Sequence, residues 1–291
     1  AASYNPTFPN FKNPETGMWD ENANANEVQN PLGRLDIDDR ETNAFINTNA
    51  RITWSINNDL KLSAFGSYTY NVKENKKYIP SSIKAGLSNR GEAYRGDNKS
   101  QSMLANLMLT YKKSFGKHYI NALGLAEVQR VTNTGFGSTV HGFSTDDFLY
   151  NNLQAGAVLK WGDNTSYYNN PSLASFMARV NYSYADKYIV TVNARTDGSS
   201  KVGENNKWAF FPSASLAWVL KEEAFLKDVD MISNLKLRVG YGLAGNQDAI
   251  SSYNSLPLMS PNGTTTVNGL PVVTMGVTRN YNCLLYTSDA A

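Results

Sequence analysis

The residue types that most often carry catalysis or bind metal ions are scarce in this sequence. It contains two histidines, His118 and His141, and one cysteine, Cys283. The histidines are far apart and belong to no HExxH-like pattern, so they predict no zinc site. His118 falls in an expected tight turn, where we interpret it as a solvated residue. The sequence also has no glycine-rich phosphate loop and no dinucleotide fingerprint. We therefore predict a protein that is not an enzyme and uses no metal or cofactor.

Acidic residues are the remaining candidate metal ligands. The run DIDD at residues 36–39 and the pair Asp146-Asp147 could contact a cation. Neither has the oxygen-rich loop spacing of an EF-hand. We interpret both as solvated loop acids.

Two groups of residues suit binding better than catalysis. Trp161, Tyr167 and Tyr168 lie in the stretch LKWGDNTSYYNN, whose rings and amides suit stacking and hydrogen bonding to sugars. They suit packing between neighbouring loops equally well. The second group consists of arginines on alternating positions, namely Arg51, Arg179, Arg195 and Arg238. These either pair with acids such as Glu127 in a water-filled interior or contact a substrate or a plug.

The elements that must position these residues are strands. Apolar residues recur with a period of two, and only residues 221–227 show a helical period. The expected strands are residues 44–56, 60–71, 102–111, 119–130, 173–184, 187–195, 208–220 and 234–242. Many are longer than the five or six residues, approximately, that are usual in soluble proteins. A tilted strand of about 9–11 residues spans a bilayer.

The connections between these strands alternate in length. Tight turns are expected at residues 57–59, 114–118 and 185–186, which are rich in turn-forming residues. Long segments lie between them, at residues 72–101, 131–171 and everything after Ala244. Long loops without structure are uncommon in compact soluble domains. Alternating short turns and long loops are typical of outer-membrane barrels.

One face of every expected strand carries no charge and no amide, as at Leu107, Val180, Val192 and Leu216. A β-sandwich also alternates in this way. The many Ala and Gly residues on this face would fill a sandwich core poorly, whereas lipid tails adapt to them.

Aromatic residues gather at the strand ends, as the interfaces of a membrane favour. Those beside the short turns are Trp54, Tyr111, Tyr182, Tyr184, Tyr188 and Trp218, and those toward the long loops are Tyr68, Tyr70, Phe210 and Tyr241. Pro212 lies inside a strand, where we expect a bulge.

Composition and the chain ends add limited information. Charged residues make up 18%, below the roughly 25% of typical soluble domains. The net charge of +2 favours neither nucleic acid nor an anionic surface as a partner. The start, AASYNPTFPN, shows no signal peptide, and we expect the true N-terminus to be missing. The last nine residues, CLLYTSDAA, resemble a translated sequencing adapter. We expect residues 1–282 to be the barrel domain and residues 283–291 a non-native tail; the alternative is a genuine terminal strand.

A family resemblance rests on residues 194–247. The stretch combines an Arg-x-Asp-Gly-Ser-Ser loop, Asn-Asn-x-Trp, an aromatic-Pro-Ser step, Leu-Lys-Leu-Arg and Gly-Asn-Gln. It closely resembles a barrel segment of the SusC/RagA family of TonB-dependent outer-membrane transporters. The motif residues singled out are Arg195, Asp197, Gly198, Ser199, Ser200, Asn206, Trp208, Pro212, Gly245, Asn246 and Gln247. The departures are Val202 and Glu204, which bear on loop detail alone.

The resemblance implies about eight strands of an antiparallel, plugged barrel that has roughly 22 strands in this family. Such a piece should form an open, curved sheet. It also implies a Gram-negative outer membrane, TonB coupling, a SusD-like surface lipoprotein and uptake of a glycan or oligopeptide. Residues 195–207 are expected to form an outside hairpin with a structural role. The alternatives are a passive porin or adhesin without TonB coupling, and a soluble carbohydrate-binding sandwich.

Overall fold

The computed structural model describes residues 11–20, 30–203, 207–227, 229–246, 250–253 and 256–279. Asn206, Gln247 and the expected tail at 283–291 lie outside the described residues. The chain divides into two compact units that share the long strands. The first unit comprises Ala1–Ile46, Tyr70–Gln101 and Asn133–Asn169, and the second comprises Asn47–Thr69, Ser102–Thr132 and Asn170–Ala291.

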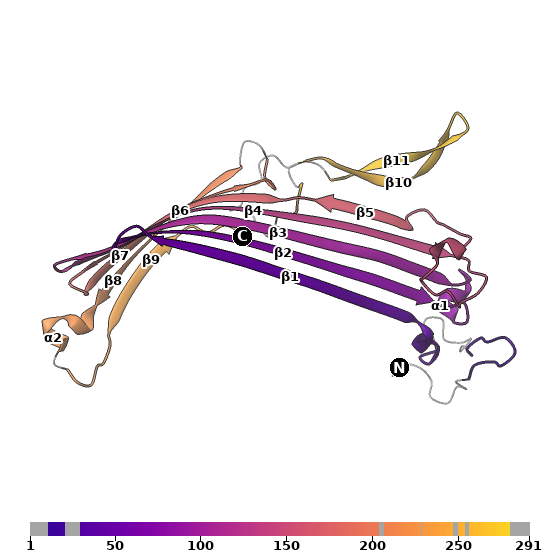
Figure 1. The fold of residues 1–291 in the computed structure, drawn as a ribbon, viewed down its shortest axis with the longest axis horizontal. Coiled ribbons are helices and arrows are strands. Elements are labelled where there is room, and N and C mark those ends of the chain that lie inside the picture. The colour runs from indigo at the N-terminus through magenta and orange to yellow at the C-terminus, as the bar shows by residue number, and fades with distance from the viewer. Residues whose placement is uncertain are drawn as a thin grey trace. The chain divides into compact units, whose positions relative to one another are not determined.

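Most of the described chain is antiparallel β-sheet (Figure 1). The principal sheet has the order β1 (Asp38–Ser55), β2 (Leu60–Ile79), β3 (Glu92–Phe115), β4 (His118–His141), β6 (Ser172–Tyr184), β7 (Tyr188–Ser199), β8 (Trp208–Val219) and β9 (Lys236–Gly242). The ninth strand of this sheet, β5 (Asn164–Asn169), pairs with β4 beyond the end of β6. Within the described residues β1 and β9 each have one neighbouring strand, so the sheet is open, as predicted.

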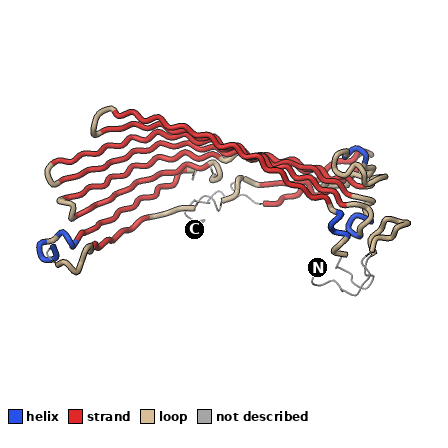
Figure 2. The backbone as a smooth tube through the Cα atoms, turned by 60° about the horizontal axis from the view of Figure 1, so that its bottom comes forward, coloured by secondary structure: helices blue, strands red, loops and turns tan. Residues whose placement is uncertain are grey.

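The remaining elements are short. A separate hairpin pairs β10 (Leu258–Val267) with β11 (Leu270–Arg279). The helical pieces, drawn blue in Figure 2, are η1 (Gly33–Asp36), α1 (Lys84–Leu87), η2 (Leu153–Ala155), η4 (Leu220–Glu222) and α2 (Ala224–Lys227). Within the described residues, no helix is long and apolar enough to cross a membrane.

All eight expected strands are present, but three extend far into segments that the sequence predicted as loops. Strand β2 continues to Ile79, β3 begins at Glu92, and β4 continues to His141. The segment after Ala244, also predicted as loop, contains β10 and β11. The extensions carry polar residues at successive positions, as in Lys73-Glu74-Asn75-Lys76-Lys77, so the period-two signal disappears. The backbone hydrogen bonds of a ladder need no such alternation.

The short connections are tight turns, as predicted. Between β6 and β7, Ala185 and Asp186 both have left-handed φ angles, of 52° and 57°. Two consecutive left-handed residues match the twist of the flanking strands in a two-residue hairpin. Between β1 and β2, the Asn57 side-chain oxygen accepts hydrogen bonds from the backbone N–H groups of Asp59 and Leu60, each at 2.9 Å. These local bonds close the turns without help from distant parts of the chain.

The bulge expected at Pro212 is absent. Strands β7 and β8 pair one-to-one through Ala194 and Pro212. The Pro212 carbonyl accepts a hydrogen bond from the Leu243 N–H at 3.0 Å, and so faces the β9 side. A residue in an antiparallel ladder directs its N–H and C=O to the same neighbour, so the donor that proline lacks would also face β9. The β8–β9 ladder ends one pair earlier, at Ser213 and Gly242, so the proline breaks no pair within it.

The first unit contains a cluster of buried hydrophobic residues. Tyr78 and Ala93 are fully buried, and they pack with Val140, Phe143 and Tyr150. The Tyr78 hydroxyl and the Ser81 hydroxyl donate to the Asp146 carboxylate at 2.6 and 3.0 Å. Asp146 is therefore a structural acceptor, which corrects its interpretation as a solvated acid; Asp147 is exposed, as expected.

Candidate functional site

The second unit has one face that carries uncharged side chains in rows across neighbouring strands. One row joins Ala122, Val180, Val192, Ala214 and Tyr241, and the next joins Ile120, Tyr182, Val190, Leu216 and Val239. We call this the apolar face. Its side chains are open to the surroundings, with exposed fractions of 48% for Val192 and 62% for Leu216. Exposed apolar rows of this extent are typical of the lipid-facing side of a membrane sheet.

Aromatic rings end the apolar face beside the short turns. His118, Tyr184, Tyr188 and Trp218 form one row. The rings of Tyr188 and Trp218 are stacked, with centroids 6.3 Å apart. The His118 ring stacks on Phe115, and its Nδ1 lies 2.7 Å from the Tyr182 hydroxyl. The interpretation of His118 as a solvated turn residue is therefore wrong.

The polar tips of two of these rings bond to Glu223, which lies between η4 and α2. The Tyr188 hydroxyl and the Trp218 Nε1–H donate to one carboxylate oxygen at 2.7 and 3.0 Å. The Lys187 ammonium donates to the other at 3.1 Å. The bonds from Tyr188, Trp218 and Lys187 lower the pKa of Glu223. Rings with an apolar body and a bonded polar tip suit an interface between lipid and water.

The opposite face of the second unit, which we call the polar face, carries side chains that bond mainly to one another. The Arg179 Nε donates to Asn193 at 2.6 Å, and the Asn193 amide donates to the Ser213 hydroxyl at 3.0 Å. Further cross-strand bonds join Thr191 to Asn181, Asn106 to Glu127, Thr53 to Ser63, and Asn47 to Thr69. Of the arginines expected here, Arg51 lies over the Phe65 ring at 4.9 Å. Glu127 accepts from Asn106, whereas the arginine–acid pair on this face is Arg195 with Asp197.

The Arg-x-Asp-Gly-Ser-Ser motif holds the end of β7 to β6. The Arg195 Nε donates to both Asp197 oxygens at 2.8 and 2.9 Å, and its terminal nitrogen donates to the fully buried Ser175 at 3.1 Å. Ser199 accepts the Lys201 N–H at 3.3 Å. The N–H of Ser172, the first residue of β6, donates to the Ser200 hydroxyl at 2.8 Å, and the Ser200 N–H donates to the Ser172 carbonyl at 3.0 Å. Both Asp197 oxygens are thus bonded to the Arg195 guanidinium.

Gly198 of the motif lies in a strand and not in a turn. It lies in β7 opposite Trp208, and its φ is outside the left-handed region. A Cβ at Gly198 would lie 2.8 Å from the Trp208 ring, which stacks on Phe176 with centroids 5.9 Å apart. The glycine therefore provides room for the tryptophan. The signal was weak in the sequence because the contact forms only when β7 and β8 pair.

The substrate-contact candidates do not form one cluster. Tyr167 and Tyr168 lie on β5, while Trp161 precedes it; all three are more than half exposed. The Tyr167 hydroxyl donates to Asn98 at 3.0 Å, and its ring lies over Gly135. Tyr167 thus joins β5 to β3 and β4. Arg179 belongs to the second unit, and Gly245 and Asn246 follow β9.

His141 is a polar centre that the sequence did not predict. Its ring, almost fully buried in the first unit, lies between Glu92 and Asp163, with nitrogen–oxygen distances of 3.4 and 3.2 Å. Its partners are distant in sequence, so no local spacing signals the cluster. Within the described ranges, no group of three or more His, Cys, Asp and Glu side chains is arranged to hold a metal ion.

Comparison with known proteins adds independent information. A family model described as TonB dependent receptor-like, beta-barrel, matches residues 2–279. TonB-dependent receptor P3 of Formosa agariphila is 36% identical over 84% of this chain, and TonB-dependent receptor SusC of Bacteroides thetaiotaomicron is 32% identical over 85%. The chain spans 24% of the length of each of these relatives, about a quarter.

Solved structures show the same fold. The RagAB peptide transporter matches with a TM-score of 0.78 and 22% identity, covering 88% of this chain and 28% of that chain. The RagAB peptide importer in the 'open-open' state gives a TM-score of 0.74 at 21% identity, covering 87% and 27%. The likeness confirms that the open sheet has the fold of part of a larger barrel.

Proposed function

The chain belongs to the TonB-dependent receptor family, and we propose that it forms part of the barrel wall of a transporter for bulky nutrients in the outer membrane of a Gram-negative bacterium. The observation that carries this proposal is the register of the second unit. It places Val180, Val192 and Ala214 in one uncharged, exposed row and Arg179, Asn193 and Ser213 on the reverse side. A wall with lipid on one side and water on the other needs this separation.

The cargo and partners follow from the relatives. One relative carries the name SusC, and the matching solved structure is a peptide transporter. We therefore propose a glycan or an oligopeptide as cargo, a SusD-like surface lipoprotein as a partner, and coupling to TonB through a part of the protein outside this chain. Trp161, Tyr168 and Arg179 are candidate cargo contacts, since the two aromatic rings and the Arg179 side chain are exposed.

Energy coupling gives the direct test of this proposal. The complete gene is expressed in a host that lacks its own copy, and uptake of labelled oligosaccharides and oligopeptides is measured with and without TonB. Loss of TonB, or collapse of the proton gradient, should abolish uptake, whereas surface binding of the cargo should persist. Uptake that continues unchanged without TonB would favour the passive porin.

The loop of residues 195–207 provides a second prediction, because its bonds point to a structural role. Asp197→Ala leaves the Arg195 guanidinium unpaired, at a cost of about 1–3 kcal/mol, and Trp208→Ala removes the stack on Phe176. Both variants should lower the amount of transporter in the outer membrane severalfold, since changes of this size alter abundance. Uptake per inserted molecule should stay close to wild type, measured as transport normalised to surface-labelled protein.

A matched variant distinguishes this role from cargo binding. Lys201→Ala removes a charge from the same loop and leaves the Arg195–Asp197 pair and the Trp208 stack in place. It should therefore keep normal abundance and normal uptake. Normal insertion with lost uptake, in this variant or in Asp197→Ala, would show that the loop binds cargo or the lipoprotein.

A further inference from the structure

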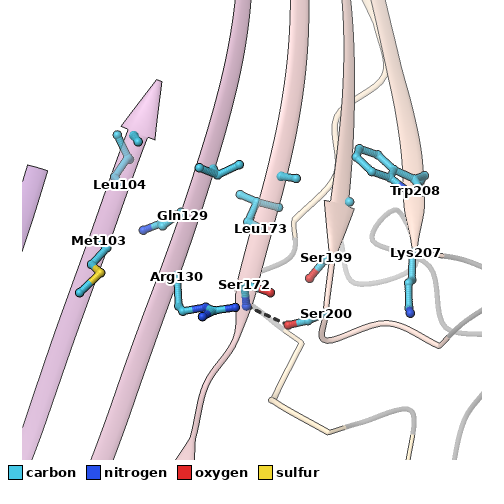
Figure 3. A pocket seen from close by; sticks show the side chains of 14 residues that line it. Met103, Leu104, Gln129, Arg130, Ser172, Leu173, Ser199, Ser200, Lys207 and Trp208 are labelled. Atoms are coloured by element: carbon cyan, nitrogen blue, oxygen red, sulfur yellow. Dashed lines mark hydrogen bonds between the residues drawn. The ribbon is translucent and has the colours of Figure 1, made fainter. Parts of the chain in front are cut away.

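A hollow of about 650 Å³ opens on the second unit, between β3 and the start of β8 (Figure 3). Four of the strands around it, β3, β4, β6 and β7, have neighbours on both sides. The fifth is the start of β8, which pairs there with β7 alone, because the β8–β9 ladder begins at Ser213.

The part of the hollow between Val128 and Trp208 belongs to the apolar face. Val128, Ala174, Gly198 and Trp208 form one row across β4, β6, β7 and β8. Val128 and Trp208 are more than half exposed, as is Met103 on β3. The Trp208 ring lies over Gly198, and the small side chain of Ala174 leaves space for an apolar chain between this ring and Val128. Alkyl groups and an indole ring suit a hydrocarbon tail.

The end of the hollow at Arg130 and Lys207, drawn lowest in Figure 3, is cationic. Arg130 lies two positions beyond Val128 and therefore on the same face. It pairs in register with Ser172, and Figure 3 shows its side chain extending toward Ser172, with Ser200 next to Ser172 and Lys207 farther across, on the β8 side. No aspartate or glutamate in the described part of the chain lines the hollow. Among the described residues, neither the Arg130 nor the Lys207 side chain has a hydrogen-bond or ion-pair partner.

The position of the two cations along the strands also indicates the kind of ligand. The apolar rows run from His118, in the aromatic row beside the short turns, to Val128. This matches the roughly 9–11 residues with which a tilted strand spans a bilayer. If the sheet is a membrane wall, as proposed above, Arg130 and Lys207 lie at the interface opposite the short turns. Lipid headgroups occupy that level.

We propose that this hollow binds one outer-leaflet lipid with a phosphorylated headgroup. An acyl chain lies against Met103, Val128 and Trp208, and the phosphorylated headgroup lies between Arg130 and Lys207. Guanidinium and ammonium groups form short, charge-assisted bonds with phosphate oxygens. The hydroxyls of Ser172 and Ser200 are placed to bond the remaining headgroup oxygens. This inference rests on the proposed membrane location and is independent of cargo and TonB coupling.

The test uses the complete transporter in lipid nanodiscs that contain either bis-phosphorylated lipid A or its dephosphorylated form. Native mass spectrometry after extraction into mild detergent counts the lipid that stays bound. Wild type should retain the phosphorylated form roughly tenfold more than the dephosphorylated form, and the double variant Arg130→Gln/Lys207→Gln should lose that preference. The control Lys117→Gln/Lys236→Gln removes the same charge from two positions near the short turns, away from the hollow, and should retain the lipid as wild type does.

Two further measurements, a second variant and a phosphate competition, complete the test. Ala174→Trp fills the apolar part of the hollow and keeps both cations, so it should also lose the lipid. This variant tests the site independently if the double variant folds poorly. Millimolar inorganic phosphate should not displace the lipid; displacement would indicate a site for free phosphate and overturn the proposal. Equal retention by wild type and the double variant would also overturn it. Retained lipid in a protein without TonB-dependent uptake would refute the proposed transport and leave the lipid site intact.

Discussion

Val192→Arg should destabilise the membrane-inserted transporter by about 2–4 kcal/mol, the cost of a cation on the lipid face near the bilayer centre. Val192 lies midway along the apolar rows, with Val180 and Ala214 on either side and Tyr241 beyond. An arginine there would find no acid and no water among its neighbours. The free energy of unfolding is measured in urea on protein reconstituted into vesicles.

The neighbouring position provides the control for Val192→Arg. Thr191 lies on the polar face, in a row with Asn181 and Ser215, so Thr191→Arg places the same charge toward water. Its cost should be far smaller. Asn193 is a poorer control, because it already bonds to Arg179, and a second cation there would add repulsion. Equal costs at Val192 and Thr191 would mean that the assignment of the two faces is wrong.

A second large effect is expected when this chain is produced by itself without detergent or lipid. Within the described residues, the outer edges of β1 and β9 have no neighbouring strand. Unpaired edges and exposed apolar rows both promote association. The chain should therefore aggregate, as seen by light scattering and size-exclusion chromatography after refolding. The same chain refolded into detergent micelles should stay dispersed, because micelles cover the apolar face. A monodisperse, detergent-free monomer would contradict this expectation.

The parts of the fold that the sequence revealed are those in which one face differs chemically from the other. The row of Val180, Val192 and Ala214 was predictable because polar residues alternate with it in every strand. From Lys73 to Lys77, β2 carries polar side chains on both faces, so the sequence there has no period-two contrast although the backbone pairing continues. The same loss of contrast hid the ends of β3 and β4.

The candidate site was predictable only at the level of motif. The family pattern identified Arg195, Asp197 and Trp208, but their partners are Ser175, Phe176 and other residues that pairing of the strands brings near. The His141 cluster and the hollow at Arg130 had no sequence signal for the same reason. Each forms from strands far apart in the chain, and single-sequence patterns report mainly on neighbours.

The mutual bonding of the polar face has a kinetic consequence. Asn193, Thr191 and Ser213 already bond to side chains on adjacent strands. In the proposed transporter, a sugar or peptide that passes this surface must break such a bond for each one it makes, so the net gain is small. Conduction requires binding that is weak enough to let the solute leave. The polar face of the proposed wall would therefore bind passing cargo only weakly and release it quickly.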